Sequence, residues 1–265
     1  MRWIWVFLLA GCGSAPVHFP PTDRTAAHWE RPALREGDSL FDYGAFSGVF
    51  DSRRRVPVWV AYRLTAQHLA QKSAPRFGGP FFPDPEIAGC PVHEDYQAFR
   101  GYDRGHLAPS ADFRWSAEFQ KTTFQTTNIA PQKSCFNRGL WARLEKRVRD
   151  WAERRGETSV VAGPVGRDCQ QVAKGICAPR QFFKAVLARS EGDWEGIGFV
   201  FANDCEKPDL SDAAMTIDAL ESLTGLDLFA AVDRVVQERA EARLNKAFWF
   251  TPLDVASKPG RRRLK

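Results

Sequence analysis

The stretch GYDRGHLAPSADF, residues 101–113, decides how this chain is interpreted. Within it, aspartate, arginine, glycine and histidine stand together as Asp103, Arg104, Gly105 and His106. A histidine can accept a proton at working pH because its unperturbed pKa is near neutrality, although an isolated histidine is more often structural. The Asp and Arg neighbours can orient an imidazole ring or a phosphate, and Gly105 permits the backbone to pass close to a ligand. The stretch therefore makes His106 a candidate general base.

A second group of polar residues follows on a predicted helix. Asn137 and Glu145 offer an amide carbonyl and a carboxylate, which are oxygen ligands suited to a hard cation such as Mg²⁺. Eight residues correspond to a rotation of about 80° on an α-helix, so both side chains can face one cleft. Alternatively, Asn137 caps the helix and Glu145 pairs with Arg149 one turn later. The residues alone leave both interpretations open.

Hydrophobic periodicity predicts a mixture of strands and helices. Apolar residues recur at three- and four-residue steps over residues 137–155, which predicts an amphipathic helix that stops at Gly156. Apolar segments flanking the polar turn at residues 51–55 predict a β-hairpin, and residues 124–129 predict a short strand before Pro131. Further core strands are predicted at 158–166, 182–189 and 194–202, and further helices at 212–223 and 234–246. We therefore expect an α+β fold with a mainly antiparallel sheet and packed helices.

The composition limits the classes of protein to which this chain can belong. Of the 265 residues, 44% are hydrophobic, which indicates a packed core and argues against wholesale disorder. The formal net charge is +5, which favours polyanionic partners without establishing them.

The two ends of the chain differ from its centre. The apolar run at residues 3–10 is too short to span a bilayer and fits the core of a secretory signal. It ends in Leu-Ala-Gly-Cys, which resembles the lipobox of bacterial lipoproteins, so Cys12 would be lipidated and the protein held in the cell envelope, periplasmic or outer-membrane. The alternatives are an ordinary signal with secretion, or a short hydrophobic anchor. The predicted division is a signal and lipobox at 1–12, a tether at 13–35, one domain at 36–250 and a basic tail at 251–265.

The cysteines after the lipobox fit an exported chain, in which disulfides can form. Cys169 and Cys177 are close in sequence and are the favoured pair. Cys90, Cys135 and Cys205 then remain, so at least one thiol is expected to be free. Cys135 precedes the candidate metal ligand by two residues, and we interpret it as a small buried hydrophobe rather than as a thiol that perturbs the site.

Three motifs carry a family resemblance. YDRGHLAP, TTNIAPQ and FNRGLWARLE, in this order and spacing, resemble the DNA/RNA non-specific endonuclease family, and the likeness extends over about residues 40–230. The resemblance implies a ββα-metal catalytic core, in which a hairpin bears the histidine and a helix presents the metal ligand. It implies Mg²⁺-dependent hydrolysis of DNA and RNA to 5′-phosphate products, with Mn²⁺ as the alternative ion. It also allows a homodimer and a protein inhibitor.

The resemblance implies a role for each matching position. His106 would be the general base, and Asn137 the only direct protein ligand of the metal ion. Glu145 would hold a water of the metal's outer shell, Asn128 would fix the surroundings of the base, and Asp103 would support the loop. The arginines assigned to the phosphate are Arg104, Arg149 and, on a looser match, Arg76.

Two other functions compete with this one. A non-catalytic nucleic-acid-binding surface lipoprotein would not need a general base, so an intact His106 and Asn137 argue against it. A phosphodiesterase for small substrates could use the same arginines, and the width of the groove would distinguish it.

Overall fold

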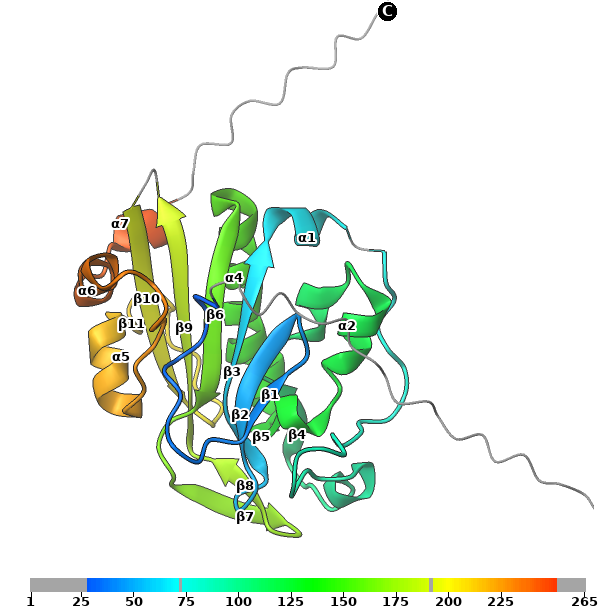
Figure 1. Ribbon diagram of the computed structural model, residues 1–265. Coiled ribbons are helices and arrows are strands. Elements are labelled where there is room, and N and C mark those ends of the chain that lie inside the picture. The colour runs from blue at the N-terminus through cyan, green and yellow to red at the C-terminus, as the bar shows by residue number, and fades with distance from the viewer. Residues whose placement is uncertain (1–27, 72, 191–192, 252–265) are drawn as a thin grey trace, which may run out of the picture.

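A seven-stranded antiparallel sheet forms the centre of the computed structural model, which describes residues 28–71, 73–190 and 193–251 (Figure 1). In spatial order its strands are β1 (Leu40–Asp42), β2 (Phe46–Asp51), β3 (Val56–Thr65), β6 (Glu157–Pro164), β9 (Gln181–Ser190), β10 (Asp193–Ala202) and β11 (Ala214–Met215). The predicted hairpin and the three predicted core strands are all present in this sheet. The α+β fold with a mainly antiparallel sheet is therefore confirmed.

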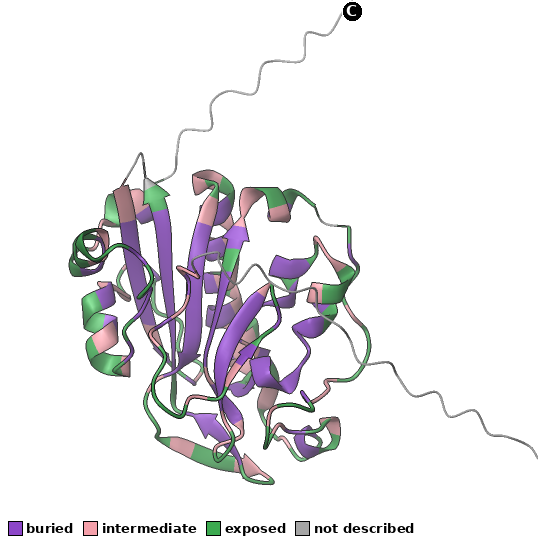
Figure 2. Ribbon diagram, in the orientation of Figure 1, coloured by how far each residue is buried: buried purple, intermediate pink, exposed green. Residues whose placement is uncertain are grey.

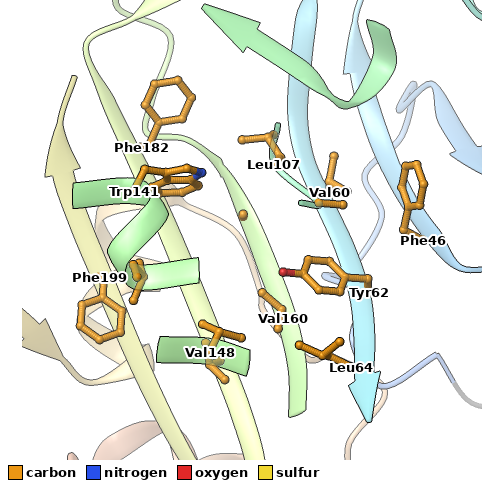
Figure 3. Close-up of a cluster of buried hydrophobic side chains, with 14 of the residues drawn as sticks. Phe46, Val60, Tyr62, Leu64, Leu107, Trp141, Val148, Val160, Phe182 and Phe199 are labelled. Carbon is orange, nitrogen blue, oxygen red and sulfur yellow. The ribbon is translucent and has the colours of Figure 1, made fainter. Parts of the chain in front are cut away.

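Both faces of the sheet are buried, because helices cover each of them. On β9, Phe182 belongs to the hydrophobic cluster on the side of α4 (Ala142–Arg155). Its neighbour Phe183 belongs to the cluster on the side of α5 (Ile217–Thr224) and α6 (Arg234–Ala242). The central strands are consequently buried along most of their length (Figure 2). Figure 3 shows the first cluster, where side chains of the sheet meet those of α4.

A two-stranded ribbon and α4 together form a unit on one side of the seven-stranded sheet. Strands β4 (Tyr102–His106) and β5 (Ile129–Lys133) pair antiparallel. The chain continues directly into α3 (Ser134–Phe136), a π-helical turn (Asn137–Trp141) and then α4. This is the ββα arrangement that the sequence motifs implied.

The strand predicted at residues 124–129 is wrong. Thr126–Asn128 form a 3₁₀ turn, and the strand begins only at Ile129 and includes Pro131. A proline lacks an N–H, but in a two-stranded ribbon half of the N–H groups point away from the partner strand, so proline is tolerated.

The remaining elements are short. Their bounds are α1 (Ala66–Ala70), α2 (Ala117–Thr122), α7 (Lys246–Phe250), the hairpin strands β7 (Cys169–Ala173) and β8 (Ile176–Pro179), and 3₁₀ turns at His93–Tyr96 and Ser110–Phe113. The helix predicted at 212–223 begins only at Ile217, where the Thr216 side chain caps it. The helix predicted at 234–246 ends at Ala242.

The N-terminal boundary of the domain lies earlier than predicted. Residues 28–35, assigned to the tether, pack against the domain: the Trp29 and Trp194 rings meet edge to face at 5.7 Å between centroids. The Ala33 N–H also donates to the Asp227 carbonyl at 2.8 Å. Residues 1–27 and 252–265 lie outside the described residues, so the signal, the lipid anchor, the cell-envelope location and the basic tail stay predictions. Within the described part of the chain, no helix combines the length and apolarity needed to cross a membrane.

Two disulfides cross-link the part of the chain that the structure describes. Cys169 and Cys177 are paired as expected. Cys135 is bonded to Cys205, 70 residues away, so its interpretation as a small buried hydrophobe is wrong. Sequence spacing cannot reveal this bond, because only the fold brings the two segments together. Cys90 has a free thiol.

A buried ion pair ties α4 to the 3₁₀ turn at Ser110–Phe113 and, through Tyr62, to β3. The Asp112 carboxylate is fully buried, accepts a hydrogen bond from the Tyr62 hydroxyl at 3.1 Å and lies 2.7 Å from Arg149 Nη1. Removing one partner of such a pair leaves an uncompensated charge in the interior, which is more costly than the pair itself.

We expect Asp112→Ala to lower the free energy of unfolding by about 3 kcal/mol, because Arg149 loses its buried partner. The matched control is Asp150→Ala, which lies next to Arg149 on α4. It breaks the exposed Lys146–Asp150 pair and should change stability by no more than about 0.5 kcal/mol. Urea unfolding of both variants measures the difference. Equal effects of the two substitutions would show that the buried pair does not anchor the helix.

Candidate active site

A polar cavity of about 490 Å³ lies beside the β4–β5 ribbon and the start of the helix. Five of the residues predicted from the sequence line it: Arg76, Asp103, Arg104, His106 and Asn137. The others that line it were not predicted: Phe81, Tyr96, Gln97, Phe99, Tyr102 and Arg138. Glu145, Asn128 and Arg149 do not line it. The fold therefore joins the candidate base and the candidate metal ligand in one place.

The ribbon explains the glycine of the central motif. Gly105 stands opposite Ala130, and a Cβ atom at position 105 would lie 2.1 Å from Oε1 of the buried Gln132 side chain. The glycine is therefore required because Gln132 fills the space beside it.

The imidazole of His106 has little contact with polar groups. Its Nε2 atom is buried, and no described residue forms a hydrogen bond with it. The ring packs against Phe81 and Phe124, with centroids 5.6 and 5.0 Å away. The backbone is held separately, because Trp141 Nε1 donates to the His106 carbonyl at 3.2 Å. Packing against these two phenylalanines, rather than a hydrogen bond at Nε2, therefore holds the ring in place.

Burial lowers the pKa of His106 to about 3, and the positive charges of Arg76 and Arg104 act in the same direction. The imidazole is consequently neutral at physiological pH, as a proton acceptor must be. The pKa of His106 in the folded protein lies below its unfolded value of about 6.5. As the pH falls below about 6.5, the unfolded chain therefore takes up a proton that the folded protein does not, and the folded state loses stability.

The cavity is electropositive. The Arg76 guanidinium lies over the Phe124 ring at 5.0 Å and donates to the Ser110 hydroxyl. The Arg104 guanidinium lies over the Phe81 ring at 4.8 Å. Neither arginine forms an ion pair with a described carboxylate, so both charges are available to an anion in the cavity.

The Asp103 carboxylate joins β4 to the start of the helix. It accepts hydrogen bonds from Ser134 Oγ at 2.9 Å, from Asn137 Nδ2 at 2.9 Å and from the Arg138 guanidinium at 2.7 and 2.8 Å. Burial alone would raise the pKa of Asp103, but these three donors outweigh that effect and hold the pKa below its usual value. The support expected of Asp103 is therefore given by direct bonds to the helix.

This contact also fixes which atom Asn137 presents. The amide nitrogen donates to Asp103, which leaves the carbonyl oxygen of Asn137 as the free acceptor at the edge of the cavity. A single amide oxygen beside open, polar space fits a hard divalent cation that keeps most of its water ligands. Asn137 does not cap α4, which begins only at Ala142.

The π-helical turn at Asn137–Trp141 has no signal in the sequence. Such turns are uncommon and occur often at functional sites, and this one alters the rotation between Asn137 and Glu145 that a regular α-helix would give. The structure places Asn137 at the cavity, whereas Glu145 does not line it.

Glu145 belongs to a buried cluster of charges next to the cavity. Burial raises its pKa, and the positive charge of Lys184 acts in the opposite direction. The Lys184 side chain is itself fully buried, with Nζ 4.5 Å from the Trp141 ring centroid, and burial lowers its pKa. Arg149 is engaged by Asp112 in the same cluster. The outer-shell role of Glu145 and the phosphate contact of Arg149 stay predictions.

Asn128 acts on the backbone next to the base. Its Oδ1 accepts from the Ala108 N–H at 2.8 Å, while Nδ2 donates to the Ala108 and Thr123 carbonyls at 2.9 Å each. The buried amide thereby fixes the chain two residues after His106. This geometry fits the expected positioning role and gives Asn128 no access to the cavity.

The loop after β10 contacts β5 and the start of the helical segment, and the motifs did not indicate this contact. Asn203 Oδ1 accepts from the Lys133 N–H at 2.7 Å, and its Nδ2 donates to the Pro131 carbonyl at 3.1 Å. The Cys135–Cys205 disulfide joins this loop to α3. An asparagine and a cysteine 70 residues from the motif give no local signal of such a contact.

A larger, mostly apolar groove of about 1050 Å³ lies between the β1–β2 region and α2. Phe77, Phe82, Pro83 and Ile87 are among the residues that line it. None of the predicted site residues does, so the chemistry is assigned to the smaller cavity.

Titration of His106 tests the electrostatics of the site. By ring-resonance NMR we expect the wild-type imidazole to stay neutral down to about pH 5, and Arg76→Ala to raise its pKa by about one unit through loss of a nearby positive charge. His68, stacked on Trp115, is the internal control and should not respond. A wild-type His106 that titrates near its unperturbed pKa would disprove the buried, electropositive environment.

Known proteins resemble this chain in sequence. Residues 31–235 match the DNA/RNA non-specific endonuclease family. A mitochondrial nuclease of Saccharomyces cerevisiae is 28% identical over 256 residues, covering 81% of this chain and 76% of that protein. The human mitochondrial nuclease EXOG is 30% identical over 205 residues, covering 70% of this chain and 55% of that protein. This chain therefore spans about half the length of the human protein.

A solved structure shares the fold. A chain in the crystal structure of the EndoG/EndoGI complex superimposes with a TM-score of 0.72 at 25% identity, covering 79% of this chain and 92% of that chain. Fold, motifs and relatives together indicate a metal-dependent endonuclease that acts on nucleic acid. This chain therefore belongs to the DNA/RNA non-specific endonuclease family, with its ββα-metal fold.

Proposed function

We propose that this protein is a Mg²⁺-dependent, sugar-non-specific endonuclease that hydrolyses phosphodiester bonds of DNA and RNA to 5′-phosphate products. One observation carries the proposal: a single electropositive cavity holds a neutral imidazole, from His106, together with the free amide oxygen of Asn137. A binding module needs neither group.

His106 supplies the base. A water in line with the 3′ oxygen of the scissile bond attacks phosphorus, and the neutral imidazole accepts the proton of that water. Contacts with Phe81 and Phe124 keep the ring in place. The bond between phosphorus and the 3′ oxygen breaks, the 3′ oxygen takes up a proton from solvent water, and the phosphate remains on the 5′ side. Because the nucleophile is water, the 2′-hydroxyl is not required, and both DNA and RNA are substrates.

The arginines stabilise negative charge on the substrate phosphate. Arg76 and Arg104 border the cavity without carboxylate partners among the described residues, so they offset the negative charge that grows on the phosphoryl oxygens. Contacts of this kind read the phosphate backbone and carry little sequence information. They support cleavage that is independent of base sequence.

The metal site rests on Asn137. Its amide oxygen would hold the cation, while Asp103 keeps the amide turned to present that oxygen. A divalent cation bound there would act as a Lewis acid and stabilise the negative charge that develops in the transition state. One protein ligand also favours weak binding, so activity should depend strongly on the concentration of added metal.

The cavity is open and borders an exposed arginine, Arg138, which favours a polymer over a small phosphodiester. The homodimer, the membrane anchor and the protein inhibitor stay predictions. The structural relative is in complex with EndoGI.

Digestion of supercoiled plasmid and of single-stranded RNA tests the proposal. We expect both to be cut with Mg²⁺, neither with EDTA, and restored cutting when Mg²⁺ is returned. His106→Ala should lower the rate by about 100-fold or more while DNA binding persists, because a general base contributes that much and binding depends on the arginines. His68→Ala, outside the cavity, is the matched control and should cut normally.

The product ends provide an independent check, since 5′-phosphates can be labelled by polynucleotide kinase only after phosphatase treatment. Cleavage that survives complete chelation would refute the metal requirement. Wild-type cutting by His106→Ala would refute the base. Hydrolysis of small phosphodiesters without cutting of plasmid or RNA would favour the phosphodiesterase.

A further inference from the structure

Three carboxylates meet on the far side of the sheet from the catalytic cavity. Asp218 and Glu221 lie one turn apart on α5, and Glu241 lies on α6. One oxygen of each lies within 4.8 Å of the others. Figure 1 shows α5 and α6 next to each other beside β10, away from β4 and β5. Their apolar residues pack in the second hydrophobic cluster, whereas the catalytic unit packs in the first.

Glu241 is the unusual member of this group. Its side chain is only 6% exposed, and its Oε1 atom is buried without a hydrogen-bond partner among the described residues. A buried carboxylate oxygen without a partner is costly, so such a group normally pairs with a cation or binds a metal ion.

No basic side chain compensates the cluster. Within residues 28–71, 73–190 and 193–251, none of the three carboxylates forms an ion pair with lysine or arginine. Glu221 Oε1 accepts the Leu228 N–H at 2.6 Å, which leaves the other oxygen of that carboxylate for a ligand. Burial raises the pKa of Glu241 to about 8, and the neighbouring carboxylates act in the same direction, while a hydrogen bond from the Gln237 side chain to this carboxylate opposes them.

We propose that Asp218, Glu221 and Glu241 bind a hard divalent cation, with Ca²⁺ the best fit, and that this cation clamps α5 to α6. Three carboxylates supply oxygen ligands only, and Asp218 is exposed, so water can complete a coordination shell of the irregular kind that Ca²⁺ accepts. Mg²⁺ demands a stricter octahedron and is expected to bind less tightly. The site is structural, and its position behind the sheet separates it from the catalytic metal.

Calcium binding to the full-length chain tests the proposal by titration calorimetry. All proteins carry Asn137→Ala, which removes the amide oxygen of the catalytic cavity, so the remaining binding reports the second site. We expect one Ca²⁺ per chain, and a loss of affinity of at least about tenfold in Glu241→Gln, because a buried charged ligand is lost. Glu238→Gln is the matched control, because it removes the same charge from the exposed face of α6, where Glu238 pairs with Arg234.

Thermal unfolding gives a second readout that does not depend on activity. Ca²⁺ should raise the Tm of the Glu238→Gln protein, increasingly with concentration, and leave the Tm of Glu241→Gln unchanged. Without calcium, Glu241→Gln should be at least as stable as its parent, because a neutral amide replaces a carboxyl group that its surroundings already keep largely protonated at neutral pH. Should that variant fail to fold, Asp218→Asn at the exposed ligand must show the loss of affinity instead. No Ca²⁺ binding by the parent protein, or equal binding by the Glu238 and Glu241 variants, would overturn the proposal and leave a protonated Glu241 as the explanation.

Discussion

The hydrogen bonds of one carboxylate hold the candidate active site together. Asp103 lies on β4, three residues before the histidine, and accepts from Ser134, Asn137 and Arg138 at the start of the helical segment. These bonds set the distance between the strand that bears the base and the helix that bears the amide oxygen. Trp141 adds a second link to the His106 carbonyl. The site is therefore rigid where chemistry requires it, because its two halves are bonded directly to each other.

The electrostatics follow from the same arrangement. Burial beside Phe81 and Phe124, with Arg76 and Arg104 close by, keeps the imidazole neutral, and the unpaired guanidinium groups leave the cavity positive. A neutral base in a positive cavity suits attack by water on an anionic phosphodiester. Carboxylates near the site are either bonded, as Asp103 is, or buried with cationic partners, as Asp112 is with Arg149. Repulsion of the phosphate by free carboxylates is thus limited.

The sequence predicted the parts of the structure that have local signals. Apolar runs rich in β-branched and aromatic residues located the central strands, and the 3.6-residue period located α4 up to Gly156. The short motifs identified His106 and Asn137, which share the cavity. The features it missed depend on contacts between distant segments. The Cys135–Cys205 bond, the support from Asn203 and the packing of Gln132 against Gly105 cannot be read from spacing. The π-helical turn and the strand through Pro131 contradict ordinary propensities, since tertiary contacts outweigh them there.

The central claim is that His106 and Asn137 serve one reaction from the two halves of the ββα unit. A double-mutant cycle on plasmid cleavage tests it most directly, using His106→Ala, Asn137→Ala and the combined variant at fixed Mg²⁺. Groups that act as a unit are strongly non-additive, so the double variant should cleave about as slowly as the slower single variant. If the two losses in rate multiplied, the side chains would contribute independently, and this account of the site would be contradicted.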